Sequence, residues 1–253
     1  MFHFIELLLM PSVVSLNLAI NTIMTPPQND YVLPYVATVQ ISKENTTLAK
    51  LIEKLPDDVQ YNDNDLWLVN ALNPLKGGEL IELVDFEGVT VSKTIEQPLM
   101  SLLEAATKEG FDFTIISGYR SKELQESNRQ ASIANYQAAG MDYDEAVKLT
   151  DQYFAPTDAS EHSTGLAVDL LGSDWIAFGG ELTGDYANEP SAKWLADNAY
   201  KFGFILRYMD GKTNITGYNF EPWHYRYVGH KNAQFIHDYQ LTLEEYLALL
   251  QYK

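Results

Sequence analysis

The stretch from Ser160 to Asp169 constrains what this chain can fold into more than any other part of the sequence. His162 and Asp169 stand on either side of Gly165 and a run of small and apolar residues, a pattern typical of a turn that leads into a buried strand. An ionised Asp inside such a strand is strongly destabilising unless a donor, a cation or a metal ion is paired with it. We therefore expect the fold to bring a partner to Asp169.

A second group of metal-ligating residue types, Glu221-Pro222-Trp223-His224, lies in an aromatic-rich run further along the chain. Two imidazoles and one carboxylate suit zinc, and a three-ligand zinc site keeps its fourth position open for water. The chain has no Cys, so any zinc site must use His and carboxylates. Glu221 would then be close enough to move the protons of that water. A buried Asp–His pair without metal is the alternative, and the spacing leaves both open.

The spacing of Glu221 and His224 conflicts with a regular strand, in which the two side chains would point to opposite faces. Pro222 cannot donate a ladder hydrogen bond, so a bend or bulge there would turn both side chains the same way. We infer this bend from the chemistry that the site requires.

Three motifs, in this order along the chain, carry a resemblance to a known family. They are Ser117-Gly118-Tyr119-Arg120-Ser121 with Gln125, Ser160-Glu161-His162 running through Gly165 to Asp169, and Glu221-Pro222-Trp223-His224-Tyr225-Arg226-Tyr227. The chain resembles the zinc-dependent D-alanyl-D-alanine carboxypeptidases of the VanY type, which belong with the LdcB-type L,D-carboxypeptidases and the VanX dipeptidases. The likeness spans Leu66 to Gly229 and begins at Leu68-Val69-Asn70-Ala71-Leu72-Asn73-Pro74-Leu75.

The resemblance implies a role for each matching residue. One zinc ion would lie on His162, Asp169 and His224, and Glu221 would be the catalytic acid and base. Arg120 would polarise the scissile carbonyl, and Ser160 and Gln125 would help to seat the substrate.

Each of the remaining roles has a plainer alternative. Arg120 could form a surface ion pair, and Ser160 and Gln125 could cap helices or turns. Trp223 could line the substrate pocket, although aromatic residues at alternate positions usually belong to the core. We expect Glu161 to face solvent and Arg226 to form a structural salt bridge.

The resemblance and the residue patterns together predict an α+β fold, in which helices flank a small, central, mainly antiparallel sheet with the zinc site on it, as in hedgehog-like and D,D-peptidase-like folds. Alternating apolar residues and turn signals predict strands and helices. The expected strands are 65–75, a pair within 80–91, 111–115, one from Leu166, and 204–208, and the expected helices are 122–139, 142–154, 191–202, one opened by Pro98 and one capped by Thr242.

The chain divides into three expected parts. Residues 1–24 are an apolar leader, a degenerate signal or anchor, because Glu6 interrupts it and no Lys or Arg precedes Lys43. Residues 25–47, rich in Pro and polar residues, are expected to be an exposed linker. Residues 48–253 form the predicted zinc carboxypeptidase domain.

The net charge of −18 argues against nucleic acid as a partner, because phosphate binding needs clustered cations. The family resemblance implies a peptidoglycan stem peptide as the partner and a secreted or cell-surface location. Any membrane contact would run through the leader. The sequence does not set the oligomeric state.

The favoured hypothesis is a metallopeptidase that removes the terminal D-alanine from stem peptides, with D,D- or L,D-preference left open. A cell-wall endopeptidase with the same metal chemistry is a second reading. A non-catalytic peptidoglycan-binding zinc protein is a third. A domain with a closed structural zinc is a fourth, and His230 or Glu161 would be its extra ligand.

Overall fold

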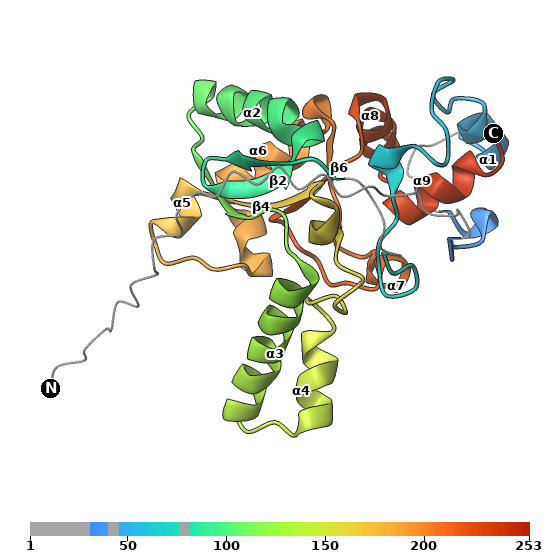
Figure 1. Ribbon diagram of the computed structural model, residues 1–253. Helices are drawn as coiled ribbons and strands as arrows, with labels where there is room; N and C mark the ends of the chain where they lie inside the picture. Colours follow the sequence, from blue (N-terminus) through green and yellow to red (C-terminus); the bar gives the residue numbers. More distant parts are fainter. Residues whose placement is uncertain (1–30, 40–45, 76–80) are drawn as a thin grey trace, which may run out of the picture.

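The computed structural model describes residues 31–39, 46–75 and 81–253, and the leader 1–24 lies outside them (Figure 1). Its centre is a four-stranded antiparallel sheet in the order β3-β4-β6-β5, beside a two-stranded hairpin of β1 and β2. The strands are β1 (Leu83–Phe86), β2 (Val89–Ser92), β3 (Phe113–Ser117), β4 (Ala167–Gly172), β5 (Phe204–Leu206) and β6 (His224–Tyr227). The predicted α+β fold with a small antiparallel sheet is therefore confirmed.

Residues of the two central strands alternate between the two faces of the sheet. Val168 and Leu170 of β4 and Tyr225 and Tyr227 of β6 belong to one apolar cluster. Because successive side chains of a strand point to opposite faces, Asp169 lies on the other face, together with His224 and Arg226. The sheet thus has a core face and a polar face.

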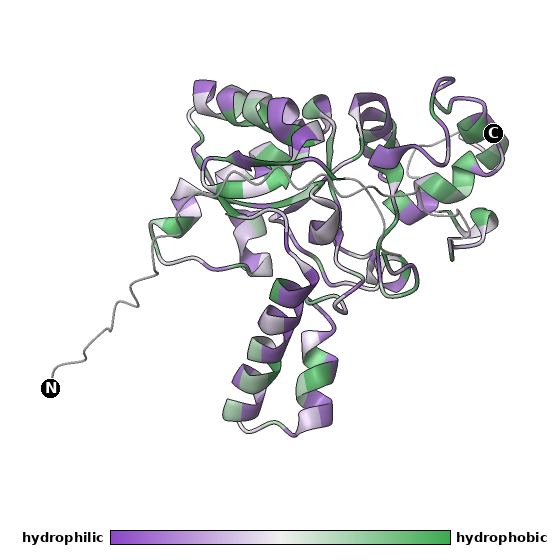
Figure 2. Cartoon of the chain, viewed as in Figure 1, coloured by the Kyte–Doolittle hydropathy of each residue, from purple (hydrophilic) through white to green (hydrophobic). Residues whose placement is uncertain are grey.

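Helices α2 (Lys93–Lys108) and α6 (Pro190–Asn198) supply the core that covers the apolar face of the sheet (Figures 1 and 2). Leu99 and Leu102 are fully buried there. The prediction that Pro98 opens the first of these helices is wrong. The helix begins five residues earlier, because the Ser92 side chain accepts a hydrogen bond from the Thr94 amide and caps it.

A second core lies to one side of the sheet, among α1 (Leu48–Ile52), α8 (His230–Tyr239) and α9 (Leu243–Leu250). Thr242 and Glu245 form the capping box predicted for the last of these helices. Helix α9 is largely hydrophobic (Figure 2), and all eight of its residues are buried. Such a helix can only be stable inside a core.

The expectation of an exposed linker holds only in part for residues 31–39, because Val32 and Tyr35 are exposed whereas Val36 and Val39 are not. Val36 and Val39, around a short 3₁₀ helix (Val36–Thr38), are buried in the second core, and Val32 donates its amide hydrogen to Asn73 Oδ1. The rest of the expected linker that the structure describes is Thr46 and Thr47, and Thr47 caps α1. Burial of two valines explains the difference, because they add apolar contact to the core.

The strand predicted over residues 65–75 is also wrong. This segment begins within a 3₁₀ helix (Asn64–Leu66), and its strand-like pairing is limited to a bridge in which Asn70 and Asn73 exchange backbone hydrogen bonds. Its Trp67-Leu68-Val69 run is buried by core packing, not by pairing with a strand of the sheet.

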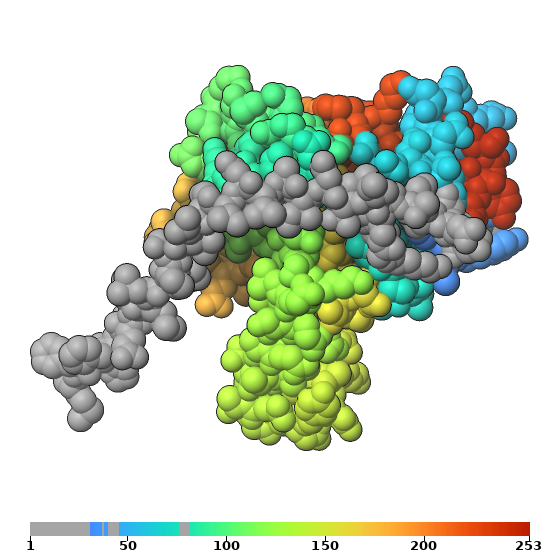
Figure 3. Space-filling view, in the orientation of Figure 1, coloured from blue at the N-terminus to red at the C-terminus, as the bar shows by residue number. Residues whose placement is uncertain are grey.

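Helices α3 (Lys122–Ala138) and α4 (Tyr143–Thr150) pack against each other and protrude from the body as an arm (Figures 1 and 3). Two further short helices are α5 (Ser173–Ile176) and α7 (Thr213–Thr216). The remaining 3₁₀ helices are Glu161–Thr164, Gly184–Asn188 and Ala199–Phe202. No helix within the described residues is both long enough and apolar enough to span a membrane.

Candidate metal centre

The sheet itself brings two of the predicted ligands together. Asp169 of β4 and His224 of β6 are directly paired across the two antiparallel strands. Side chains paired in this way point to the same face and lie within contact distance. The polar face of the sheet therefore holds one carboxylate beside one imidazole.

His162 reaches the same point from the short 3₁₀ helix Glu161–Thr164, which ends at Gly165. Gly165 has φ of 68°, and a Cβ there would meet the Ser92 amide nitrogen at 2.9 Å. Glycine is thus required both by the left-handed backbone and by the close approach of β2. It lets the chain turn from His162 directly into β4.

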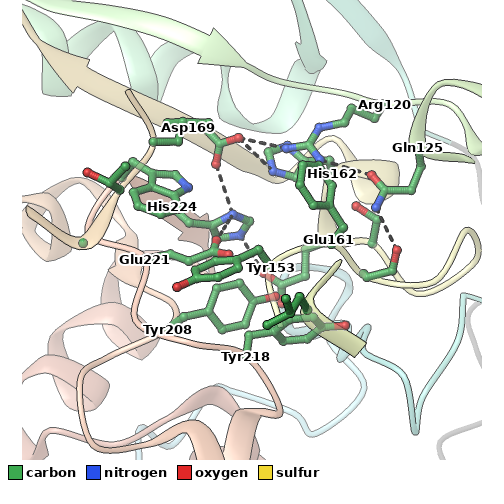
Figure 4. Close-up of a pocket in the computed structure, with 18 of the residues that line it drawn as sticks. Arg120, Gln125, Tyr153, Glu161, His162, Asp169, Tyr208, Tyr218, Glu221 and His224 are labelled. Carbon is green, nitrogen blue, oxygen red and sulfur yellow. Dashed lines mark hydrogen bonds and ion pairs between the residues drawn. The ribbon is translucent and has the colours of Figure 1, made fainter. Parts of the chain in front are cut away.

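His162, Asp169 and His224 form a cluster whose ligand atoms all lie within 4.8 Å of one another. His162 Nε2 is 3.3 Å from Asp169 Oδ2, and His224 Nδ1 is 3.2 Å from Asp169 Oδ1 (Figure 4). Tetrahedral zinc with bonds of about 2.0–2.2 Å places its ligand atoms about 3.3–3.6 Å apart. The separations across Asp169 therefore suit a zinc ion.

The hydrogen bonds around the cluster leave one ligand atom available on each residue. His162 Nδ1 donates to the Gly118 carbonyl at 2.7 Å, so Nε2 carries a lone pair towards the cluster. His224 Nε2 donates to Glu161 Oε2 at 3.3 Å, which leaves Nδ1 as the ligand atom. Asp169 Oδ1 is buried and has no hydrogen-bond partner among the described residues. A bound cation would satisfy this oxygen, so these residues fit zinc.

The carbonyl of Gly118 and the carboxylate of Glu161 thus orient the two imidazoles, as outer partners of metal-ligating histidines commonly do. Gly118 itself is needed for packing, because a Cβ there would lie 2.4 Å from the Thr90 carbonyl oxygen.

The prediction that Glu161 faces solvent is wrong. Its side chain is fully buried and accepts hydrogen bonds from Arg207 at 2.7 Å and Arg226 at 2.9 Å. Burial would raise the pKa of Glu161, but the two guanidinium groups outweigh burial and hold it well below its usual range. The salt bridge expected of Arg226 is confirmed. The signal in the sequence was the position of Glu161 directly before His162 in an otherwise uncharged run.

Glu221 and His224 point the same way because the chain turns between them, as the prediction of a bend at Pro222 required. The His224 amide donates to the Glu221 carbonyl at 3.1 Å, which closes a turn ahead of β6. Glu221 Oε2 then lies 3.6 Å from His224 Nδ1, on the wall of the cavity beside the cluster. Burial raises the pKa of Glu221 to about 8, a range suited to proton transfer near neutral pH.

The charges of the cluster also shift the pKa values of its members. Burial and the nearby Arg120 lower the pKa of His162 to about 4. Burial would lower the pKa of His224 too, but the Asp169 and Glu161 carboxylates raise it to about 9. Burial opposes ionisation of Asp169, yet the neighbouring histidines and Arg120 hold its pKa well below the ordinary value.

Arg120 lies beside the cluster with three hydrogen bonds fixing its guanidinium. Nη2 donates to Asp169 Oδ2 at 2.8 Å, Nε to Ser117 Oγ at 2.9 Å, and Nη1 to Gln125 Oε1 at 3.1 Å. The plain alternative of a surface ion pair is wrong, because the partner is the buried Asp169 and the arginine side chain is only 13% exposed.

Gln125 is buried behind Arg120 and also donates from Nε2 to the Ala155 carbonyl at 2.9 Å. Both ends of its amide are therefore bound to the protein. The structure places Gln125 as a support for Arg120, although it also lines the cavity.

The cluster opens into a cavity of about 360 Å³, within the size range of small-ligand sites. Ser160 and Trp223 line the cavity. Trp223 also packs in an apolar cluster with Leu171 and Tyr186, so it both lines the pocket and belongs to the core. The arm contributes Tyr136 and Leu149 to the lining, the segment just after α4 contributes Tyr153 and Phe154, and residues 182–184 also line the cavity. No sequence pattern indicates these lining residues, because the arm reaches the cavity through the tertiary fold.

Tyr208 and Tyr218 were also missed. The Tyr208 ring lies 4.8 Å from the His224 ring and 4.9 Å from the Tyr218 ring (Figure 4). His230, the proposed extra ligand of a closed site, instead bonds through Nδ1 to the Lys201 carbonyl at 2.9 Å. Glu161 contacts the outer nitrogen of His224 and not the cluster, so neither candidate closes the site.

Comparisons with known proteins agree with this geometry. A family model described as VanY, D-alanyl-D-alanine carboxypeptidase, matches residues 88–230. A D-alanyl-D-alanine carboxypeptidase of Enterococcus faecalis is 37% identical over 205 residues, which are 81% of this chain and 72% of that protein.

Two solved structures share the fold. A mutant of the D,D-pentapeptidase VanY from a VanB-type vancomycin resistance cassette, in complex with Zn(II), is 38% identical with a TM-score of 0.66, over 73% of this chain and 99% of that one. The LD-carboxypeptidase LdcB is 32% identical with a TM-score of 0.60, over 82% of this chain and 92% of that one.

The matched family model spans 143 of the 253 residues, and the relative from Enterococcus faecalis is matched over most of both chains. The solved VanY structure adds the metal that the cluster of His162, Asp169 and His224 fits. The chain therefore belongs to the VanY family of D-alanyl-D-alanine carboxypeptidases and is a zinc-dependent metallopeptidase.

Proposed function

We propose that this chain removes the C-terminal D-alanine from peptidoglycan stem peptides, with His162, Asp169 and His224 as the zinc ligands and Glu221 as the acid and base. One observation carries the proposal. Oδ1 of the buried Asp169 has no hydrogen-bond partner within the described part of the chain and lies 3.2 Å from His224 Nδ1, and Glu221 lies beside them on the cavity wall.

The chemistry divides between the metal and the side chains. Zinc, when bound, supplies a Lewis acid that activates water near neutral pH and polarises a carbonyl. Glu221 accepts a proton from the attacking water at its carboxylate. It then delivers that proton to the nitrogen of the departing D-alanine as the amide C–N bond breaks.

Arg120 stabilises the negative charge that develops on the carbonyl oxygen. A guanidinium has five N–H donors, and three of them are bound to Ser117, Gln125 and Asp169. The other two have no hydrogen-bond partner among the described residues, and Arg120 lines the cavity. Because the three bonds fix the side chain, little reorganisation is needed when charge develops.

Replacing Glu221 with Ala tests the acid and base role. We expect kcat for D-alanine release from a pentapeptide stem to fall about 100- to 10,000-fold, because the proton acceptor is lost. Zinc content, measured by elemental analysis, should stay at the wild-type level, because Glu221 is not one of the ligands. Wild-type turnover by the zinc-loaded Glu221→Ala protein would refute the mechanism, and loss of zinc would make Glu221 a ligand.

A preference for a D,D-bond is supported by the descriptions of the family model and of the relative in Enterococcus faecalis as D-alanyl-D-alanine carboxypeptidases. The similarity to LdcB makes L,D-activity the competing reading. Mass spectrometry of purified stems separates them: loss of one alanine from the pentapeptide means D,D-activity, and loss from the tetrapeptide means L,D-activity.

We also propose that the enzyme works outside the cytoplasm, where peptidoglycan is, and that residues 1–24 serve as its export signal or anchor. Val36 and Val39 in the second core support a catalytic domain that begins before residue 48. Edman sequencing of the protein from the cell surface would locate its mature N-terminus.

A further inference from the structure

A set of buried charges runs from His224 away from the cavity and ends at helix α9. Glu161, Arg207, Arg226 and Glu244 belong to it, and each is at most 2% exposed. None of them lines the cavity except Glu161. They come from the 3₁₀ helix before β4, the end of β5, β6 and α9.

Arg207 is the centre of this set. Its Nε donates to Glu161 Oε1 at 2.7 Å, while Nη1 and Nη2 donate to the two oxygens of Glu244 at 2.9 and 2.7 Å. The guanidinium is planar and its donors form a rigid fork. Glu244 therefore fixes the plane in which Arg207 holds Glu161.

Glu244 is itself held from the other side. Asn70 donates from Nδ2 to Glu244 Oε1 at 3.2 Å, and Asn70 Oδ1 accepts from the Leu72 and Asn73 amides in a tight turn. Asn70 belongs to the segment 68–75, with which the family resemblance begins, and it thus binds the carboxylate of Glu244 on α9. Its position explains why this segment belongs with the metal site although it is not in the cavity.

The other end of the set is the imidazole of a proposed zinc ligand. Glu161 Oε1 is bound by Arg207 and Arg226, which leaves Oε2 facing His224 Nε2. The two arginines and two glutamates balance in charge. Arg207 binds both glutamates, so removal of the Glu244 carboxylate would leave Glu161 as its remaining carboxylate partner. The guanidinium would then turn, and Glu161 would turn with it.

We propose that Arg207, clamped by Glu244 of α9, is a positioning residue that sets the orientation of Glu161 and, through it, of His224. The last helix of the fold is then part of the metal site, although it contributes no ligand. This inference rests on the proposed function, because it takes His224 as a zinc ligand.

The test compares Glu244→Gln with Glu245→Gln, two isosteric changes on one helix. Glu245 is equally buried but is bound by Lys212 and caps α9. We expect zinc affinity, measured by competition with a chromophoric chelator, to fall about tenfold in E244Q, the lower end of the range for outer partners of metal ligands. The visible spectrum of the cobalt-substituted protein should change as well. Both properties should stay at wild-type values in E245Q.

A second variant covers the case in which E244Q does not fold. Arg207→Lys keeps the charge but lacks the fork, so we expect the same loss of zinc affinity and the same spectral change. If the folded variant keeps the zinc affinity and cobalt spectrum of E245Q and loses only thermal stability, α9 is merely structural and the inference is overturned.

His224→Ala separates this outcome from failure of the proposed function. If H224A binds zinc as tightly as the wild type, His224 is not a ligand and the proposed function fails. If H224A loses zinc while E244Q and R207K do not, only the positioning role fails.

Discussion

Arg120 offers the sharpest test of how the site divides metal holding from charge stabilisation. The guanidinium binds Asp169, Ser117 and Gln125 at once, and its side chain is 13% exposed to the cavity. Lysine keeps the charge but has one compact ammonium group, so Arg120→Lys cannot make these three bonds and also reach a substrate oxygen.

Arg120→Lys should have two separate effects, one on kcat and one on zinc affinity. Loss of one donor to a developing oxyanion lowers kcat about 100- to 1,000-fold, or about 2.7–4 kcal/mol. Loss of the hydrogen bond to Asp169, a proposed ligand, lowers zinc affinity about 10- to 100-fold. Zinc in excess should restore occupancy but not kcat.

The assay is release of D-alanine from a pentapeptide at increasing zinc, with metal content measured on the same samples. Arg129→Lys is the matched control, because Arg129 has a side chain 15% exposed and pairs with Asp151 on the arm. It should turn over like the wild type. If excess zinc returns R120K to the wild-type kcat, Arg120 acts only through Asp169 and its role towards the carbonyl is refuted.

Two further predictions concern protons and packing. Zinc binding to the apo protein at pH 7 should release about one proton or more, because the pKa of His224 is raised to about 9 and its imidazole must be neutral to bind metal. Zinc affinity should therefore rise between pH 7 and 9. Heats of zinc binding that do not depend on the ionisation enthalpy of the buffer would contradict this prediction. Leu102→Ala should lower the free energy of unfolding of the zinc-loaded protein by about 2–5 kcal/mol, because Leu102 is fully buried under the sheet. Met100 on the same helix is 37% exposed, so Met100→Ala should lower the free energy of unfolding, measured by urea denaturation, by about 0.5 kcal/mol or less. Equal losses of unfolding free energy in the two variants would contradict the packing of Leu102.

The sequence predicted the parts of the fold that depend on local patterns. The strand at β4, the arm helices and the capping box at Thr242 follow from apolar spacing and from capping chemistry, which act within a few residues. The bend at Pro222 was predicted from the demand that Glu221 and His224 face one point. Local patterns failed where burial came from distant chain segments, as at Val36 and Val39 and at residues 65–75.

Glu161 shows why the orienting partners of the site could not be predicted from the sequence. An isolated glutamate is normally exposed, and Arg207 and Arg226, 46 and 65 residues away along the chain, stabilise its burial. The support of Arg120 by Gln125 and the aromatic wall of the cavity are likewise products of tertiary contact. Motifs identified candidate ligands, whereas their orienting partners became visible only in three dimensions.

The direct pairing of Asp169 with His224 ties the metal site to the alignment of two strands. If β6 slid by one residue along β4, every side chain of β6 would change face, and His224 would enter the apolar layer beneath α2 and α6. The three side chains can thus surround one ion in a single alignment of the sheet. A zinc ion bound there would therefore stabilise the native pairing of β4 and β6 relative to pairings shifted by one residue.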